Sequence, residues 1–240
     1  FRPLSGVFQH LRSVKDEAEI ARIREAARIA GEALAAVRGM IRPGVREEVI
    51  EIELEYLMRR GGAEKASFDT IVAAGPNTAL PHATPGRREI ADGDCVMIDY
   101  GAVWEGYHSD ETCTYIVGRA SERQREIYGL VREAHDRAIG AIRAGVSCGE
   151  IDRIAREFLR DAGIEGCFSH GTGHGVGMDV HEAPRLAAGR EEILLAGMVV
   201  TVEPGIYLPG VWGVRIEDTV LVTEGGCELL TQTSKELTII

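Results

Sequence analysis

Four carboxylates stand next to apolar stretches of the chain that have the composition of buried strands. Asp99 lies within CVMIDYGAV, Asp110 precedes ETCTYIV, Glu203 lies within VVTVEPGI and Glu217 lies between VRI and DTVLV, so we expect them to be embedded in strands. A carboxylate is costly to bury unless a cation compensates its charge. One such residue is more often salt-bridged or at a sheet edge, but four that converge in two pairs favour a bound metal.

The segment SHGTGHGVGMDVHEAP contributes three of the seven histidines. His170 and His174 have the i, i+4 spacing of a helical zinc site, yet glycine at every second position from Gly171 to Gly177 disfavours a helix. We therefore predict a glycine-rich loop or strand, whose glycines let the backbone approach metals and substrate and leave His174 free to ligate.

An imidazole among several carboxylates suits two divalent cations of the Mn²⁺, Co²⁺, Fe²⁺ or Zn²⁺ type, whereas Mg²⁺ or Ca²⁺ alone would not need the histidine. Two such ions, typically about 3.5–4 Å apart, share a bridging water, lower its pKa and polarise a carbonyl oxygen. The residues therefore indicate a hydrolase.

Strand pairing decides whether these carboxylates meet. If Glu105-Gly106 is a tight turn, Asp110 lies opposite Gly101, and Asp99 shares a strand face with Gly101. By the same reasoning, a turn centred on Gly210 places Glu203 opposite Glu217. A slip of one residue would put one carboxylate of a pair on the wrong face.

The remaining elements form two similar sets. Aligning Ile41 with Ile142 also aligns Gly44 with Gly145, which predicts an internal duplication of a helix pair. The apolar periodicity predicts helices over residues 13–40, 47–60, 121–143 and 149–161. Strands are expected within residues 67–75, 95–104, 107–118, 198–208 and 214–223.

The composition restricts the class of protein. The chain has 240 residues, 45% of them hydrophobic, which is enough for one sizeable core. A net charge of −11 argues against a nucleic-acid partner, and the longest apolar stretch, residues 193–202, is too short to span a membrane. Five cysteines without a CxxC pair favour a reducing cytoplasm.

Four blocks carry a resemblance to a known family: IDYGAVWEGYHSDETCTYIVG, HGTGHGVGMDVHEAP, TVEPGIY and VRIEDTVLVT. They resemble the pita-bread metallopeptidases, which include Xaa-Pro dipeptidase (prolidase), Xaa-Pro aminopeptidase and methionine aminopeptidase. The resemblance runs from about Lys15 to the last residue. It implies an α+β pita-bread fold, with duplicated helix pairs related by a pseudo-two-fold axis around a curved, mainly antiparallel sheet.

The resemblance also implies a ligand set for two divalent metal ions. In it Asp99 chelates one ion, Asp110 and Glu217 bridge both, and His174 and Glu203 complete the second position. Mn²⁺ or Co²⁺ are the expected ions, with Zn²⁺ and Fe²⁺ as alternatives.

Further roles follow from the same resemblance. His82 and His181 are expected to contact the substrate around the scissile bond, and Glu203 to carry a proton for a metal-bridging hydroxide. His170 and Arg215 resemble a pair found in the proline-directed members, which methionine aminopeptidases typically lack. Arg215 could orient a carboxylate, bind the substrate, or form a plain ion pair with a neighbouring acid.

These features predict an exopeptidase that hydrolyses the Xaa-Pro bond at the N-terminus of dipeptides or short peptides. The alternatives are a methionine aminopeptidase, a metal-free peptide-binding module and a creatinase-like amidinohydrolase. Proline-directed members usually carry an N-terminal domain, so residues 1–13 are expected to be a linker from such a domain and residues 14–240 the catalytic domain. Substrate length and oligomeric state, including a homodimer, stay open.

Overall fold

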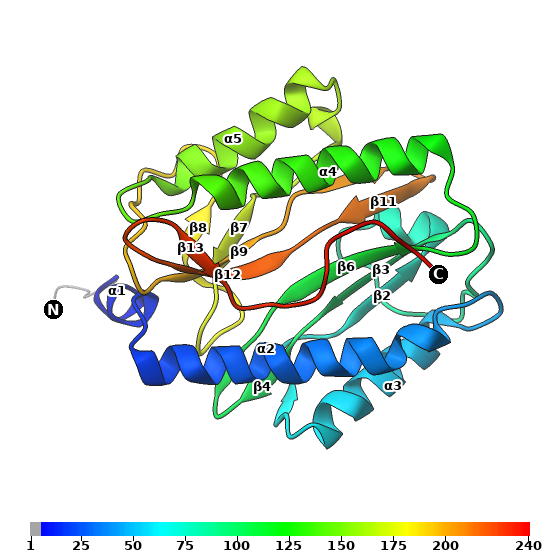
Figure 1. The fold of residues 1–240 in the computed structure, drawn as a ribbon, viewed down its shortest axis with the longest axis horizontal. Coiled ribbons are helices and arrows are strands. Elements are labelled where there is room, and N and C mark those ends of the chain that lie inside the picture. Colours follow the sequence, from blue (N-terminus) through cyan, green and yellow to red (C-terminus); the bar gives the residue numbers. More distant parts are fainter. Residues whose placement is uncertain (1–5) are drawn as a thin grey trace, which may run out of the picture.

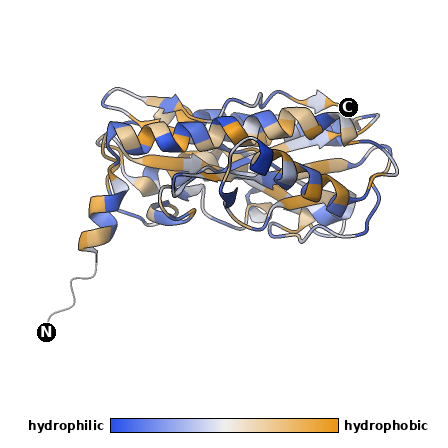
Figure 2. Cartoon of the chain, turned by 90° about the horizontal axis from the view of Figure 1, so that it is seen from below, coloured by the Kyte–Doolittle hydropathy of each residue, from blue (hydrophilic) through white to orange (hydrophobic). Residues whose placement is uncertain are grey.

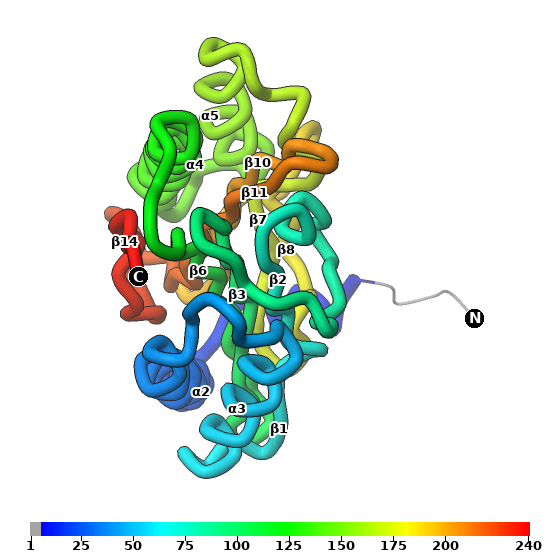
Figure 3. The backbone as a smooth tube through the Cα atoms, turned by 90° about the vertical axis from the view of Figure 1, so that its right-hand side faces the viewer, coloured from blue at the N-terminus to red at the C-terminus, as the bar shows by residue number. Residues whose placement is uncertain are grey.

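The computed structural model describes residues 6–240 as two helix pairs flanking a layer of strands. In Figures 1 and 3, helices α2 and α3 lie along one side of the strands, and α4 and α5 lie along the other. The helices are α1 (Val7–Ser13), α2 (Glu17–Val37), α3 (Glu47–Arg60), α4 (Glu122–Ala141) and α5 (Cys148–Asp161), with short 3₁₀ turns η1 (Arg38–Met40), η2 (Gly75–Ala79) and η3 (Glu165–Cys167).

The strands form two main sheets, one built mainly from each half of the chain, although the last strand, β14, joins the sheet of the first half. The first has the order β14-β6-β3-β2 and the second β13-β12-β9-β7-β8, and the small sheets β1-β4-β5 and β10-β11 complete the layer. Their bounds are β1 Lys65–Ala66, β2 Ile71–Ala74, β3 Cys95–Tyr100, β4 Ala102–Trp104, β5 Tyr107–His108, β6 Glu111–Ile116, β7 Gly173–Gly175, β8 Glu182–Leu186, β9 Val199–Val202, β10 Gly205–Leu208, β11 Trp212–Arg215, β12 Asp218–Val222, β13 Cys227–Leu229 and β14 Thr238–Ile239.

Each helix pair has its own apolar core against its own strands. Buried residues of α2 and α3 pack on β2, β3 and β6, while those of α4 and α5 pack on β9, β11 and β12. Figure 2 shows the same division, because the long helix nearest the viewer is banded blue and orange while the strands behind it are largely orange. Such a one-sided apolar stripe is what holds a surface helix on a sheet.

The predicted duplication is confirmed by matching backbone hydrogen bonds. Gly44 N–H donates to the carbonyl of Ile90 at 2.9 Å, and Gly145 N–H donates to that of Leu194 at 2.9 Å. In return, Ile90 N–H donates to Val45 O and Leu194 N–H donates to Val146 O. Both glycines have a positive φ, so the two helix connections adopt the same backbone conformation.

The helix bounds agree with the sequence except at the first helix. The N-cap Asp16 accepts a hydrogen bond from Glu19 N–H at 2.9 Å and starts α2 there, rather than at Ser13. Of the expected linker, residues 1–5 lie outside the described residues, and residues 7–13 form the separate helix α1.

Both predicted strand registers are confirmed. Trp104 pairs with Tyr107 and Asp99 with Thr112, which is the pairing that the Glu105-Gly106 turn requires. On the second hairpin, β10 pairs with β11 and β9 with β12 in one continuous register that places position 203 opposite 217. The carboxylates are therefore aligned by the turns.

None of the helices formed by residues 6–240 combines the length and the apolar character that crossing a bilayer requires.

Candidate metal centre

Three of the four carboxylates lie at breaks between strands, so the expectation that they are embedded in strands is correct only for Asp99 on β3. Asp110 separates β5 from β6, Glu203 separates β9 from β10, and Glu217 separates β11 from β12. At these breaks the backbone N–H forms hydrogen bonds outside the strand pair. Glu203 N–H donates to Thr172 O at 2.8 Å, and Glu217 N–H donates to Thr112 O at 3.2 Å. A break frees the side chain to turn towards the neighbouring half.

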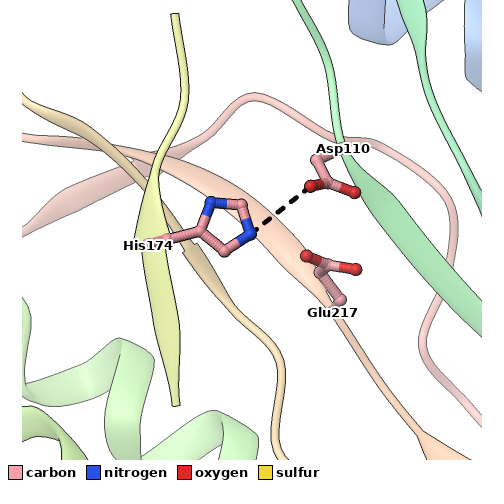
Figure 4. A group of neighbouring side chains, drawn as sticks. All are labelled: Asp110, His174 and Glu217. Carbon is pink, nitrogen blue, oxygen red and sulfur yellow. Dashed lines mark ion pairs between the residues drawn. The ribbon is translucent and has the colours of Figure 1, made fainter. Parts of the chain in front are cut away.

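Asp110, His174 and Glu217 converge on one point (Figure 4). Each offers a ligand atom, and these atoms all lie within 4.8 Å of one another. The Nε2 atom of His174 lies 3.5 Å from Asp110 Oδ2 and 3.3 Å from Glu203 Oε1. The first half of the chain supplies Asp110, and the second half supplies the other three residues.

Asp99 is held beside this group by Arg215. The guanidinium donates to Asp99 Oδ2 at 2.5 Å, while the second oxygen of Asp99, Oδ1, is buried without a hydrogen-bond partner. Arg215 also donates to the Tyr207 hydroxyl at 2.9 Å, to Pro81 O at 3.1 Å and to Thr112 Oγ1 at 3.1 Å. Arg215 therefore forms the ion pair that was one of its three expected roles, and its partner, Asp99, is a predicted metal ligand.

The carboxylates repel one another. Burial, followed by the negative charges of Glu217 and Asp99, raises the pKa of Asp110 well above its ordinary value. Burial and the charges of Glu203 and Asp99 raise the pKa of Glu217 in the same way, and burial raises the pKa of Glu203 to about 8. A bound cation would remove this conflict, so the donor set and the orphaned Asp99 oxygen fit a metal.

His174 has the protonation state of a ligand. Burial, followed by the charge of His181, lowers the pKa of His174 to about 3, so the ring is neutral at ordinary pH. Its Nδ1 atom lies 3.1 Å from Gly175 O, which places the proton on Nδ1. The Nε2 lone pair is then directed at the carboxylates, as a metal ligand requires.

The glycines around His174 are required by the packing of the strands. His174 lies on strand β7, as one of the two predicted forms allowed. A Cβ at Gly173 would lie 1.9 Å from Thr201 O, and one at Gly175 would lie 2.2 Å from Ala183 O, so strands β9 and β8 approach too closely for a larger residue. Gly171 and Gly173 also line the cleft, and the approach of this backbone to metals and substrate stays a prediction.

All nine predicted site residues line one cleft of about 960 Å³. His181 lies over the His174 ring with centroids 4.3 Å apart, and His82 is exposed at the cleft. His170 Nε2 lies 2.8 Å from the Tyr207 hydroxyl, and burial lowers the pKa of His170 to about 4. Besides the five predicted metal ligands, the lining includes His82, His170, His181 and Arg215.

Sequence reasoning missed Tyr207, whose hydroxyl links His170 to Arg215. It stands in the apolar block TVEPGIY with no polar neighbour to single it out. His135 on α4 lies outside this cleft; it is 2% exposed and its Nε2 atom lies 3.2 Å from Asp218 Oδ2.

Comparison with known proteins identifies the family. The model of metallopeptidase family M24 matches residues 21–224. The chain belongs to metallopeptidase family M24. The expected pita-bread fold is confirmed by the solved M24 structures that it matches.

Named relatives share both sequence and structure with this M24 chain. An Xaa-Pro dipeptidase of Pyrococcus furiosus is 46% identical over 99% of this chain and 68% of its own length. The structure of an Xaa-Pro dipeptidase from Bacillus anthracis superposes with a TM-score of 0.98 at 46% identity, over 100% of this chain and 68% of that one. An X-Pro aminopeptidase from Thermotoga maritima superposes with a TM-score of 0.96 at 40% identity, over 99% and 67%.

Proposed function

We propose that this chain hydrolyses the Xaa-Pro bond at the N-terminus of dipeptides or short peptides. The observation that carries the proposal is the single cleft in which the carboxylates, His174, His170 and Arg215 all meet. Relatives at 46% identity are named Xaa-Pro dipeptidases, and a structural relative at 40% is named an X-Pro aminopeptidase. A methionine aminopeptidase is disfavoured because the pair His170 and Arg215 is present.

We further propose that five side chains hold two divalent ions, with Mn²⁺ or Co²⁺ preferred. When bound, such ions polarise the scissile carbonyl and lower the pKa of a water. The uncompensated negative charge of the cluster supports the proposal. The five side chains are Asp99, Asp110, His174, Glu203 and Glu217.

The remaining groups prepare the cleft for a peptide. Arg215 fixes one oxygen of Asp99 and donates to the Tyr207 hydroxyl, which is then oriented to donate to His170 Nε2. Glu203 is placed to carry a proton, because its pKa lies near neutral pH in the metal-free protein. The exposed imidazoles of His82 and His181 are available to donate hydrogen bonds to the reacting carbonyl.

A cytoplasmic location is part of the proposal. Each of the five cysteines in the described residues is free, which supports a reducing compartment.

The test is hydrolysis of an Xaa-Pro dipeptide, an Xaa-Pro-Yaa tripeptide and a Met-Ala-Ser peptide by chelator-stripped protein, with and without Mn²⁺, Co²⁺ or Zn²⁺. We expect metal-dependent cleavage of the proline substrates only. The ratio of dipeptide to tripeptide cleavage then distinguishes the dipeptidase from the aminopeptidase. Cleavage of Met-Ala-Ser alone would contradict the assigned specificity.

Glu203→Gln tests the proton-carrying group in the same assay. Loss of a general acid–base group typically lowers the rate by a factor of about 10²–10⁴, so kcat should fall by at least about 100-fold. The matched control is Glu224→Gln, an exposed residue outside the cleft whose replacement should leave kcat unchanged. Equal activity of the two variants would exclude Glu203 from the reaction.

A further inference from the structure

A buried charged cluster lies behind the metal centre and is not used by the proposed reaction. Lys235 donates to Glu111 Oε1, and its Nζ atom lies 3.4 Å from Asp218 Oδ1. The three residues are only 6%, 1% and 4% exposed, respectively. Burial opposes the charge on Lys235, but the neighbouring negative groups outweigh it and raise its pKa, so the side chain stays an ammonium.

The two carboxylates of this cluster follow the predicted bridging ligands directly in sequence. Glu111 comes after Asp110 at the start of β6, and Asp218 comes after Glu217 at the start of β12. Asp110 and Glu217 line the cleft, whereas Glu111 and Asp218 do not line it and contact Lys235 instead. Lys235 therefore contacts equivalent positions of the two halves at once.

The chain around Lys235 is itself fixed between the two helix pairs. In Figures 1 and 3 the last segment, in red, runs between α2 and α4 on the face of the strands away from β8. The Tyr128 hydroxyl of α4 donates to Lys235 O at 2.9 Å, and Thr233 Oγ1 lies 3.1 Å from the Tyr100 hydroxyl. Strand β14 then pairs in parallel with β6, with Ile239 opposite Ile116.

The remaining polar atoms of both carboxylates are also engaged. Glu111 accepts a hydrogen bond from the Tyr100 hydroxyl at 2.6 Å. Asp218 accepts one from Thr231 Oγ1 at 2.6 Å and lies 3.2 Å from His135 Nε2. Neither carboxylate is free to rotate without breaking several buried contacts, so the backbone at each strand start is held in one orientation.

We propose that Lys235 is a positioning residue that ties β6 to β12 and thereby sets the separation between Asp110 and Glu217. It touches neither the metal ions nor the substrate. The inference rests on the proposed metal centre, because a bridging site needs ligands from both halves at a fixed spacing. Partners of this kind around a metal site typically change metal affinity by a factor of about 10–100 when they are replaced.

The experiment measures Mn²⁺ binding to the chelator-stripped protein by isothermal titration calorimetry, together with Tm with and without Mn²⁺. For Lys235→Met we expect the Kd for Mn²⁺ to rise by about tenfold or more, and the metal-induced increase in Tm to shrink. Lys235→Arg keeps the positive charge and should restore most of the affinity. A merely stabilising role would lower Tm by the same amount with and without Mn²⁺.

Arg88→Met is the matched control, because Arg88 forms an ion pair with Asp94 at 2.9 Å outside the cleft. It should lower Tm and leave the Kd for Mn²⁺ unchanged. If Lys235→Met does not fold, Asp218→Asn keeps the side-chain volume and removes one contact of the ammonium, and it should also weaken Mn²⁺ binding.

Two results would overturn the inference in distinguishable ways. Wild-type Kd in both Lys235→Met and Asp218→Asn would show that the cluster serves stability only, and the proposed function would stand. A wild-type protein that binds none of Mn²⁺, Co²⁺ and Zn²⁺ would overturn the metal centre and this inference together.

Discussion

Asp110 is a buried carboxylate whose charged neighbours are mostly other carboxylates. Its raised pKa means that, without metal, its negative charge opposes folding. We therefore expect Asp110→Asn to stabilise the metal-stripped protein while abolishing Mn²⁺ binding. Such a trade-off between stability and function is common at functional sites. The gain should be about 1–2 kcal/mol, or a rise in Tm of roughly 2–8 °C for a chain of this size.

Calorimetric scans of chelator-treated wild-type and variant proteins, each repeated with Mn²⁺, measure both effects. Asp161→Asn, on the exposed end of α5, is the control for removing a negative charge from the surface. A variant less stable than wild type in the absence of metal would show that Asp110 has a favourable partner in the folded protein, and would contradict the electrostatic picture.

At the scale of residues, sequence could identify the donors but not how each is satisfied. The five proposed ligands could be singled out because carboxylates beside apolar runs, and a histidine in a glycine-rich segment, are exceptional. Two features could not be predicted, because they depend on contacts between distant segments. They are the Asp99 oxygen that lacks a hydrogen-bond partner and the Tyr207 hydroxyl that lies between His170 and Arg215. The close backbone contacts at Gly173 and Gly175 could not be predicted for the same reason.

Helix α5 holds the segment that leads into the metal centre. Asp152 on this helix accepts hydrogen bonds from Thr172 N–H at 3.1 Å and Thr172 Oγ1 at 2.9 Å, and it pairs with Arg156 at 3.0 Å. The carbonyl of Thr172 in turn accepts from Glu203 N–H. Asp152 is 1% exposed, so its contacts are shielded from water.

We expect Asp152→Ala to destabilise the protein, because it leaves the buried N–H and Oγ1 of Thr172 without their acceptor and removes the carboxylate paired with Arg156. The cost should be about 2–4 kcal/mol, measured by urea denaturation with a constant m-value. Glu157→Ala on the exposed face of the same helix should change stability by no more than about 0.5 kcal/mol. Similar losses in the two variants would mean that helix propensity, not the Thr172 contact, is responsible.

At the scale of elements, the sequence predicts most of what turns and caps decide. The two hairpin registers followed from Glu105-Gly106 and Gly210, and they held because tight turns leave one pairing available. The strand breaks at Asp110, Glu203 and Glu217 were not predicted from the sequence. The apolar runs were taken as continuous strands, and they did not show where the backbone stops pairing with its neighbour. Helix α1 was missed because a helix of seven residues shows too little periodicity.

The two similar halves of the molecule together form the candidate metal centre. Asp99 and Asp110 come from the first half, while His174, Glu203 and Glu217 come from the second. Metal binding therefore acts across the boundary between the halves, and its free energy adds to that of folding. At a free metal concentration of 100 times Kd the stabilisation is about 2.7 kcal/mol.

This arrangement predicts different pH dependences of stability with and without metal. A carboxyl group with a raised pKa binds more protons folded than unfolded, so stability falls as pH rises from the unfolded pKa, near 4, through the folded one, about 8 for Glu203. We expect Tm of the chelator-stripped protein to fall between pH 7 and pH 9. With saturating Mn²⁺ that decline should disappear, because the metal displaces the protons and binds more tightly as pH rises.

The difference between the two series isolates the metal centre. His135 also has a raised pKa, from its contacts with Asp136 and Asp218 against the effect of burial, and it adds a decline of the same sign. The His135 contribution is present with and without metal, so it cancels when the two Tm series are subtracted. His170 and His174, with pKa values near 4 and 3, stay neutral throughout this pH range. Parallel Tm curves in chelator and in Mn²⁺ would show that the carboxylates release no protons to the metal, and would contradict this prediction.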